Sequence, residues 1–173
     1  AEWLASVYGN RGDNAKAAAV YRNFIQYNPS NPDGPNALGV FFANKMMWDK
    51  ALAAFREAAK QYPEDERPRA NIVNCYRDSN RPDEAVRELN AWIKEQPKTE
   101  TPYRQLSEIY REQGKYPEAV AAQQQCKKLS PADSLPYVAI ARIWQQAGQP
   151  EKELEELKLG AKAIPGDPVI QMR

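Results

Sequence analysis

Apolar and aromatic residues return along this chain at a fixed interval of 34 residues. When positions are counted so that Leu4 stands at position 7, that position is always leucine or isoleucine: Leu4, Leu38, Ile72, Leu106 and Ile140. Position 11 is always aromatic: Tyr8, Phe42, Tyr76, Tyr110 and Trp144. Because residues four apart share one face of an α-helix, the pattern predicts an amphipathic helix early in every interval.

A second apolar stripe follows in the later half of each interval. Position 20 is alanine in the first four intervals, and position 24 holds Tyr21, Phe55, Leu89, Gln123 and Leu157. The four-residue step again predicts a helix with one buried face. Gln123, and Glu153 at position 20, depart from this pattern because they are polar where the other intervals are apolar.

Prolines and turn residues mark where these helices begin and end. Position 32 is always proline: Pro29, Pro63, Pro97, Pro131 and Pro165. These prolines are expected to close the second helix, and Pro68, Pro102 and Pro136 to open the next first helix. Between the two helices stand residues that tolerate the left-handed conformation of a helix end: Gly12, Asn80, Gly114 and Gly148. The interval therefore predicts one helix-turn-helix unit that is repeated along the chain.

Leucine, a small residue, an aromatic, alanine, an aromatic and proline, in this order, resemble the tetratricopeptide repeat. The resemblance covers essentially the whole chain and implies an all-α fold, a right-handed superhelical solenoid of antiparallel helix pairs. We expect a single array over residues 1–167, followed by the start of an incomplete sixth helix at 168–173. The expected units are 1–31, 32–65, 66–99, 100–133 and 134–167.

Composition narrows the classes of function. The chain has 42% hydrophobic residues, 27% charged residues and a formal net charge of +1. A near-neutral balance argues against a nucleic-acid partner, including the RNA that pentatricopeptide repeats bind. No apolar run approaches 18 residues, so no membrane span is expected. The two cysteines, Cys75 and Cys126, are too few for a disulfide framework, and both are expected to be buried. The cysteines therefore do not distinguish the cytoplasm from an exported location, and both locations stay open.

The sequence carries no signature of an enzyme. It has no histidine, which excludes histidine bases, histidine-ligated metals and histidine-dependent triads. It also has no glycine-rich loop for phosphates. The acidic runs at 64–66 and 151–156 are expected to be a solvated turn and an exposed helix face. We therefore expect a non-catalytic protein without a cofactor or a metal site.

The remaining feature is a polar stripe on the first helix of each unit, at positions 2, 5, 9 and 12. In the family that this chain resembles, the stripe lines a concave groove that holds an extended peptide or a partner helix. It is small, neutral or acidic in the first two units and rich in arginine in the last three. The candidate partner-binding residues are Asn36, Arg67, Asn71, Asn74, Arg77, Arg104, Arg111 and Arg142.

Arginine grips carboxylates through two parallel hydrogen bonds, and asparagine pairs with a peptide backbone as donor and acceptor. The stripe therefore predicts recognition of an extended acidic segment. The alternative is that residues such as Arg104, Glu108 and Arg111 form ordinary ion pairs on one solvated helix. The family's clamp for a terminal carboxylate is not expected, because only Asn71 matches it.

The leading hypothesis is a scaffold that binds a protein or peptide partner. The alternatives are a structural subunit of a larger assembly and a repeat segment that recruits substrates to an enzyme. Apolar residues in the incomplete sixth helix, Val169 and Ile170 with Met172, predict an assembly face that further residues, a second copy of the chain or another subunit would cover.

Overall fold

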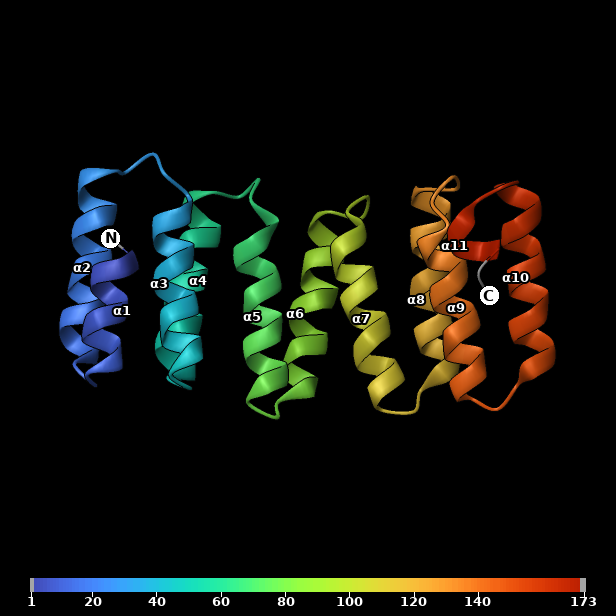
Figure 1. Cartoon of the computed structure of the whole chain (residues 1–173), viewed down its shortest axis with the longest axis horizontal. Coiled ribbons are helices and arrows are strands. Elements are labelled where there is room, and N and C mark those ends of the chain that lie inside the picture. Colours follow the sequence, from blue (N-terminus) through green and yellow to red (C-terminus); the bar gives the residue numbers. More distant parts are fainter. Residues whose placement is uncertain (1, 172–173) are drawn as a thin grey trace. The chain divides into compact units, whose positions relative to one another are not determined.

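The computed structural model describes residues 2–171, and over this range it contains helices but no strand. The helices in the first half are α1 (Glu2–Asn10), α2 (Asn14–Tyr27), α3 (Asp33–Asn44), α4 (Trp48–Gln61), α5 (Glu66–Asp78) and α6 (Pro82–Glu95) (Figure 1). Those in the second half are α7 (Glu100–Glu112), α8 (Tyr116–Leu129), α9 (Leu135–Gln146), α10 (Pro150–Ala163) and α11 (Pro168–Gln171). Met172, which the sequence placed on the assembly face, lies outside the described residues.

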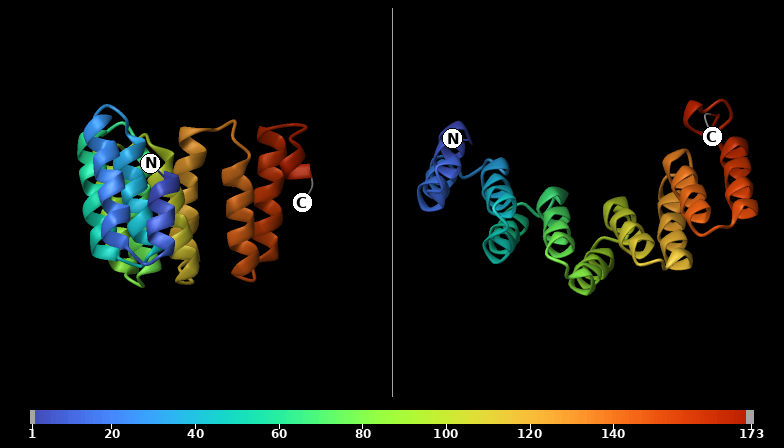
Figure 2. Two further views of the ribbon diagram at one scale, coloured as in Figure 1. Left: turned by 60° about the vertical axis from the view of Figure 1, so that its left-hand side comes forward. Right: turned by 60° about the horizontal axis from the view of Figure 1, so that its bottom comes forward.

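The chain divides into two compact parts, each larger than one 34-residue repeat. They are called unit 1 (Ala1–Ala85) and unit 2 (Val86–Arg173) from here on. In unit 1, consecutive helices from α1 to α5 pack against one another, and α3 also contacts α5. In unit 2, α7 packs on α8, α8 on α9, and α9 on α10, as Figure 2 shows for the last of these helices. The predicted all-α class of antiparallel helix pairs is confirmed. The single array of five units with its boundaries stays a prediction.

Helix ends follow from local backbone chemistry. The four residues expected in the left-handed conformation all adopt it, with φ of +80° at Gly12, +59° at Asn80, +71° at Gly114 and +68° at Gly148. The remaining turn of the same kind is formed by Met46, at φ +55°, which the sequence did not indicate because methionine rarely adopts this conformation. Each proline at position 32 stands two residues beyond the end of a helix.

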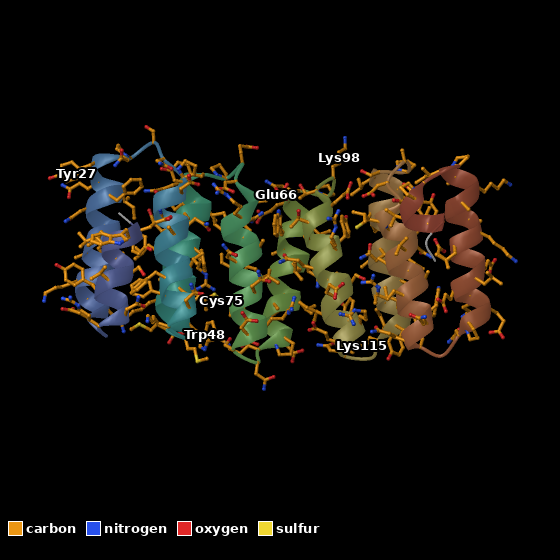
Figure 3. All side chains as sticks on the ribbon, in the orientation of Figure 1. Tyr27, Trp48, Glu66, Cys75, Lys98 and Lys115 are labelled. Atoms are coloured by element: carbon orange, nitrogen blue, oxygen red, sulfur yellow. The ribbon has the colours of Figure 1, made fainter. Side chains whose placement is uncertain are left out.

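The core runs along the inward faces of the helices. Phe55, Leu89 and Ile140 are fully buried at positions 24 and 7, as the pattern predicted. Both cysteines are buried and free, also as predicted, and burial raises the pKa of each thiol to about 11. Figure 3 places Cys75 within α5. It also shows Trp48, at the start of α4, near the lower ends of the helices in this view, and Tyr27 near their upper ends.

The last helix differs from the expectation in one respect. Ile170 was expected on an exposed assembly face, but its side chain is only 5% exposed. The reason is that α11 contacts α9 and α10, and the Ile170 side chain fills the space beside Gly160 and next to Tyr137. Ile170 is therefore removed from the proposed assembly face, whereas Val169 remains exposed.

Candidate partner-binding site

The polar stripe of unit 1 borders a hollow of about 590 Å³ between α1, α2, α3 and α5. Stripe residues form much of its lining, among them Asn36, Val40 and Arg67, while Tyr21 and Phe41 add aromatic surface. The two rings pack against each other with centroids 5.7 Å apart. The hollow thus combines amide and charged groups with an aromatic wall.

Most predicted binding residues of unit 1 already have partners inside the chain. The Arg67 guanidinium pairs with Asp33 and with Asp65, each at 2.8 Å, and the hydrogen bonds to Asp65 and then Asp33 raise the pKa of Arg67. The Asn71 amide donates to the side-chain oxygen of Asn36 at 3.0 Å. Asn74 and Arg77, on α5, are half-buried and also interact within the chain. The structure brings Asn36, Asn71 and Arg67 close together, and their partner-binding role stays a prediction.

The polar stripe of unit 2 borders two adjoining hollows of about 210 and 300 Å³. Both are lined by Glu108 of α7, Gln123 of α8, and Ala139 and Arg142 of α9. The smaller hollow adds Arg104 and apolar wall residues, Leu135, Pro136 and Val138. The larger one adds Arg111, Ile143 and Gln146. The three arginines predicted in this half therefore gather around one surface depression.

These arginines differ in how they are engaged. Arg104 pairs with Glu100 at 3.0 Å, one helical turn away. Arg111 pairs with Glu108 at 2.6 Å and donates to the side-chain oxygen of Gln146 at 3.1 Å. Arg142 is exposed and makes no ion pair or hydrogen bond with any residue that the structure describes. Its guanidinium is therefore available to an anionic ligand.

Gln123 was not among the binding residues predicted from the sequence. It comes from the second helix of its unit, whereas the candidates were sought on the first helix. Its side chain lines both hollows although the residue is only 4% exposed. The signal was present in the sequence, since glutamine at an otherwise apolar position is unusual.

Within residues 2–171 no three histidine, cysteine, aspartate or glutamate side chains gather as a metal site would require. Both thiols are buried, and their raised pKa keeps them protonated at neutral pH. None of the described helices is both long and apolar enough to cross a bilayer.

Comparison with known protein families and structures agrees with the helical pairs described above. The solved structure of MamA superposes with a TM-score of 0.63 at 14% identity, covering 92% of this chain and 87% of that one. TTC0263, a tetratricopeptide repeat protein of Thermus thermophilus, gives 0.61 at 16% identity, covering 99% and 94%. YrrB, described as a tetratricopeptide repeat protein with an unusual peptide-binding site, gives 0.60 at 15% identity, covering 99% and 88%.

At identities of 14–16%, the likeness of these structures to this chain shows a shared fold alone. A comparison with curated proteins found no match. Three family models, each described as tetratricopeptide repeat, match residues 4–66, 47–108 and 103–133. The matched stretches overlap and together span most of the chain. The chain belongs to the tetratricopeptide repeat family.

Proposed function

We propose that this chain is a non-catalytic scaffold for protein–protein interaction, and that unit 2 binds an extended acidic segment of a partner protein. Membership of the tetratricopeptide repeat family supports the scaffold role, since this family typically binds proteins and is typically non-catalytic. The observation that carries the acidic preference is the lining of the two hollows. Among the described residues, three arginines and one glutamate surround them.

The ion pairs already present leave room for an incoming carboxylate. The pairs of Arg104 with Glu100 and of Arg111 with Glu108 join partly exposed side chains on single helices. Exposed pairs of this kind contribute only about 0–1 kcal/mol, so exchanging one carboxylate for another costs little. Arg142 needs no exchange at all.

Unit 1 offers a different set of groups and, in this proposal, holds the backbone of an extended segment. Asn36, Asn71 and Asn74 carry side-chain amides that match a peptide bond as donor and acceptor. Asn36 and Asn71 hydrogen-bond to each other and Asn74 also interacts within the chain, so a peptide would share or exchange these contacts. Arg67 and Arg77 add positive charge beside them. Arg67 contributes less than its charge alone suggests, because two carboxylates already hold it.

The printed description of YrrB supports a peptide as the class of partner, since that structural neighbour has a peptide-binding site. The near-neutral net charge of +1 speaks against nucleic acid as the principal partner. A second candidate function, a structural subunit within a larger assembly, rests on exposed apolar side chains of α10 and α11, Leu154 and Val169.

The test is a titration with a capped heptapeptide in which glutamate alternates with alanine. The double variant Arg104→Ala with Arg111→Ala should bind this peptide about tenfold more weakly than the parent, while its helicity stays unchanged. Affinity of the parent should also fall as salt is added, because exposed charges are screened.

The matched control is Lys128→Ala, which removes an exposed cation of α8 that lines neither hollow. It should bind like the parent. Equal affinity of the double variant and the parent would return these arginines to the alternative of ordinary surface ion pairs.

A further inference from the structure

Repeat position 24, on the second helix of each 34-residue repeat, is a core position in the second and third repeats. In the fourth repeat this position is Gln123. Phe55 and Leu89 occupy it with 1% and 0% exposure, and Gln123 is buried almost as deeply, at 4%. Nothing in the helix itself calls for glutamine there, because an apolar or aromatic side chain fills the same place elsewhere. A buried amide without hydrogen bonds lowers stability relative to an apolar residue.

No described residue of the chain hydrogen-bonds to the Gln123 amide, and its nitrogen and oxygen are not sealed from solvent although the residue is only 4% exposed. Its side chain instead borders both hollows of unit 2, on which α7, α8 and α9 converge. The amide therefore offers two N–H donors and one carbonyl acceptor toward a space that a ligand can enter. A ligand that enters this space can therefore replace the solvent that meets the Gln123 amide.

The groups around Gln123 indicate the charge of that partner. Arg142 borders the same two hollows and has no counter-ion in the described part of the chain. Glu108, the carboxylate on this lining, is already paired with Arg111. Val138 and Ala139 provide a small apolar surface beside the two polar groups. A short side chain with a methylene stem and a negative end matches this combination.

We infer that Gln123 and Arg142 form a subsite that selects one aspartate or glutamate side chain of the partner's extended segment. The carboxylate accepts hydrogen bonds from the Arg142 guanidinium and from the Gln123 amide nitrogen. The Gln123 carbonyl oxygen accepts from a backbone N–H of the same segment. This inference rests on the proposed function and adds the residue that specifies the ligand.

The experiment compares Gln123→Leu with the parent, using the heptapeptide of alternating glutamate and alanine. The affinity of each protein for the peptide is measured by titration calorimetry. NMR of the parent additionally follows the Gln123 side-chain amide during the titration, with its resonances identified by their loss in the variant. Gln123→Leu should bind the peptide about tenfold more weakly, since a charge-assisted hydrogen bond is lost. Its Tm should rise by about 2–4 °C, because a leucine restores the apolar core position. A purely structural glutamine would give no loss of binding.

Two further variants complete the design. Gln124→Leu makes the same change at the next residue of α8, which is exposed and lines neither hollow, and it should bind like the parent. Arg142→Ala should weaken binding about tenfold without the rise in Tm. A peptide with glutamine in place of glutamate should bind the parent weakly, and one with phosphoserine in place of glutamate should bind no better than glutamate.

The outcomes separate this inference from the proposed function. If Gln123→Leu and Arg142→Ala bind like the parent while the Arg104 and Arg111 variant is weakened, the subsite is wrong and the acidic groove stands. If the parent does not bind the glutamate peptide, or prefers the glutamine or phosphoserine peptide, the carboxylate subsite is wrong. If no variant at Arg104, Arg111 or Arg142 changes the affinity, the proposed acidic groove is wrong as well.

Discussion

At the scale of single residues, the turn between the two helices of each unit shows how backbone conformation restricts side-chain choice. Four of the five equivalent positions carry glycine or asparagine at positive φ. The fifth is Met46, which has a Cβ and is forced into the left-handed region at φ +55°. For such a residue this conformation costs about 1–2 kcal/mol.

Met46→Gly should therefore stabilise the protein. The Met46 side chain is 75% exposed, so its loss removes little buried apolar surface. Glycine relieves the steric cost but adds entropy to the unfolded chain, and the net gain should be about 0.5–1 kcal/mol. Urea denaturation followed by circular dichroism measures it. The control is the reverse change at an equivalent turn, Gly114→Ala, which should lower the stability of the protein. If Met46→Gly is less stable than the parent, the turn at Met46 is not strained.

Residue patterns allowed some of these features to be predicted and hid others. The left-handed conformation could be predicted where glycine or asparagine favours it, at Gly12, Asn80, Gly114 and Gly148. Met46 gave no such indication, since the flanking helices impose the turn on whatever residue stands there. Gln123 signalled an anomaly by its type, but only the packing of α7, α8 and α9 revealed that its amide borders a hollow.

At the scale of helices, the sequence predicted the order and spacing of elements because the four-residue apolar step and the proline ladder are local signals. It could not predict how far α11 folds back on α9 and α10, because the burial of Ile170 depends on the space that Gly160 leaves. It also could not predict that Arg67 would be held by Asp33, a contact between neighbouring helices α3 and α5.

The contact between α3 and α4 depends on a helical glycine. A Cβ added to Gly39 would lie 2.4 Å from Cε1 of Phe55, and other ring atoms are within 2.8 Å. The ring is 1% exposed, so it lies within the core. The equivalent small position is alanine, valine or serine in the other units, so the close approach is specific to this pair.

Gly39→Ala should consequently destabilise unit 1 by about 1–3 kcal/mol, although alanine is the better helix former. The companion change Phe55→Leu in the same background should recover part of this loss, because leucine occupies the equivalent position as Leu89. Thermal unfolding of the single and double variants measures both effects. A Gly39→Ala protein at least as stable as the parent would mean that the two helices separate at little cost.

At the scale of the whole molecule, the two units carry different surfaces. The hollow of unit 1 is lined by amides, aromatic rings and already paired charges, and the hollows of unit 2 by arginines and an amide without a partner. Residues at equivalent repeat positions hence differ in chemistry while the helices that carry them stay alike. A repeat fold fixes where a partner can bind, and the residues on the stripe decide which partner it is.

The assembly face proposed for the C-terminal end can be defined more closely from repeat equivalence. Leu154 of α10 stands at the same repeat position as Val120 of α8, which is buried in a cluster with Ile140 and Ile143 of α9. Within residues 2–171, Leu154 is 52% exposed, and Val169 of α11 is also exposed. The Ile170 side chain of α11 packs beside Gly160. We therefore propose an assembly face that consists of Leu154 and Val169 and no longer includes Ile170.

We predict that this chain self-associates through Leu154 and Val169, because both are exposed apolar side chains and their helices, α10 and α11, contact each other. The parent should show a mass that rises with concentration in size-exclusion chromatography with light scattering. Leu154→Asp with Val169→Asp should remain monomeric, because association would bury charges without partners. Leu159→Asp is the matched control on α10: Leu159 is similarly exposed, but three of its four equivalents, Asn23, Glu57 and Gln125, are polar, so the variant should associate like the parent. A parent that stays monomeric at every concentration, or a Leu159 variant that loses association as well, would contradict this assignment and leave the second candidate function without its main support.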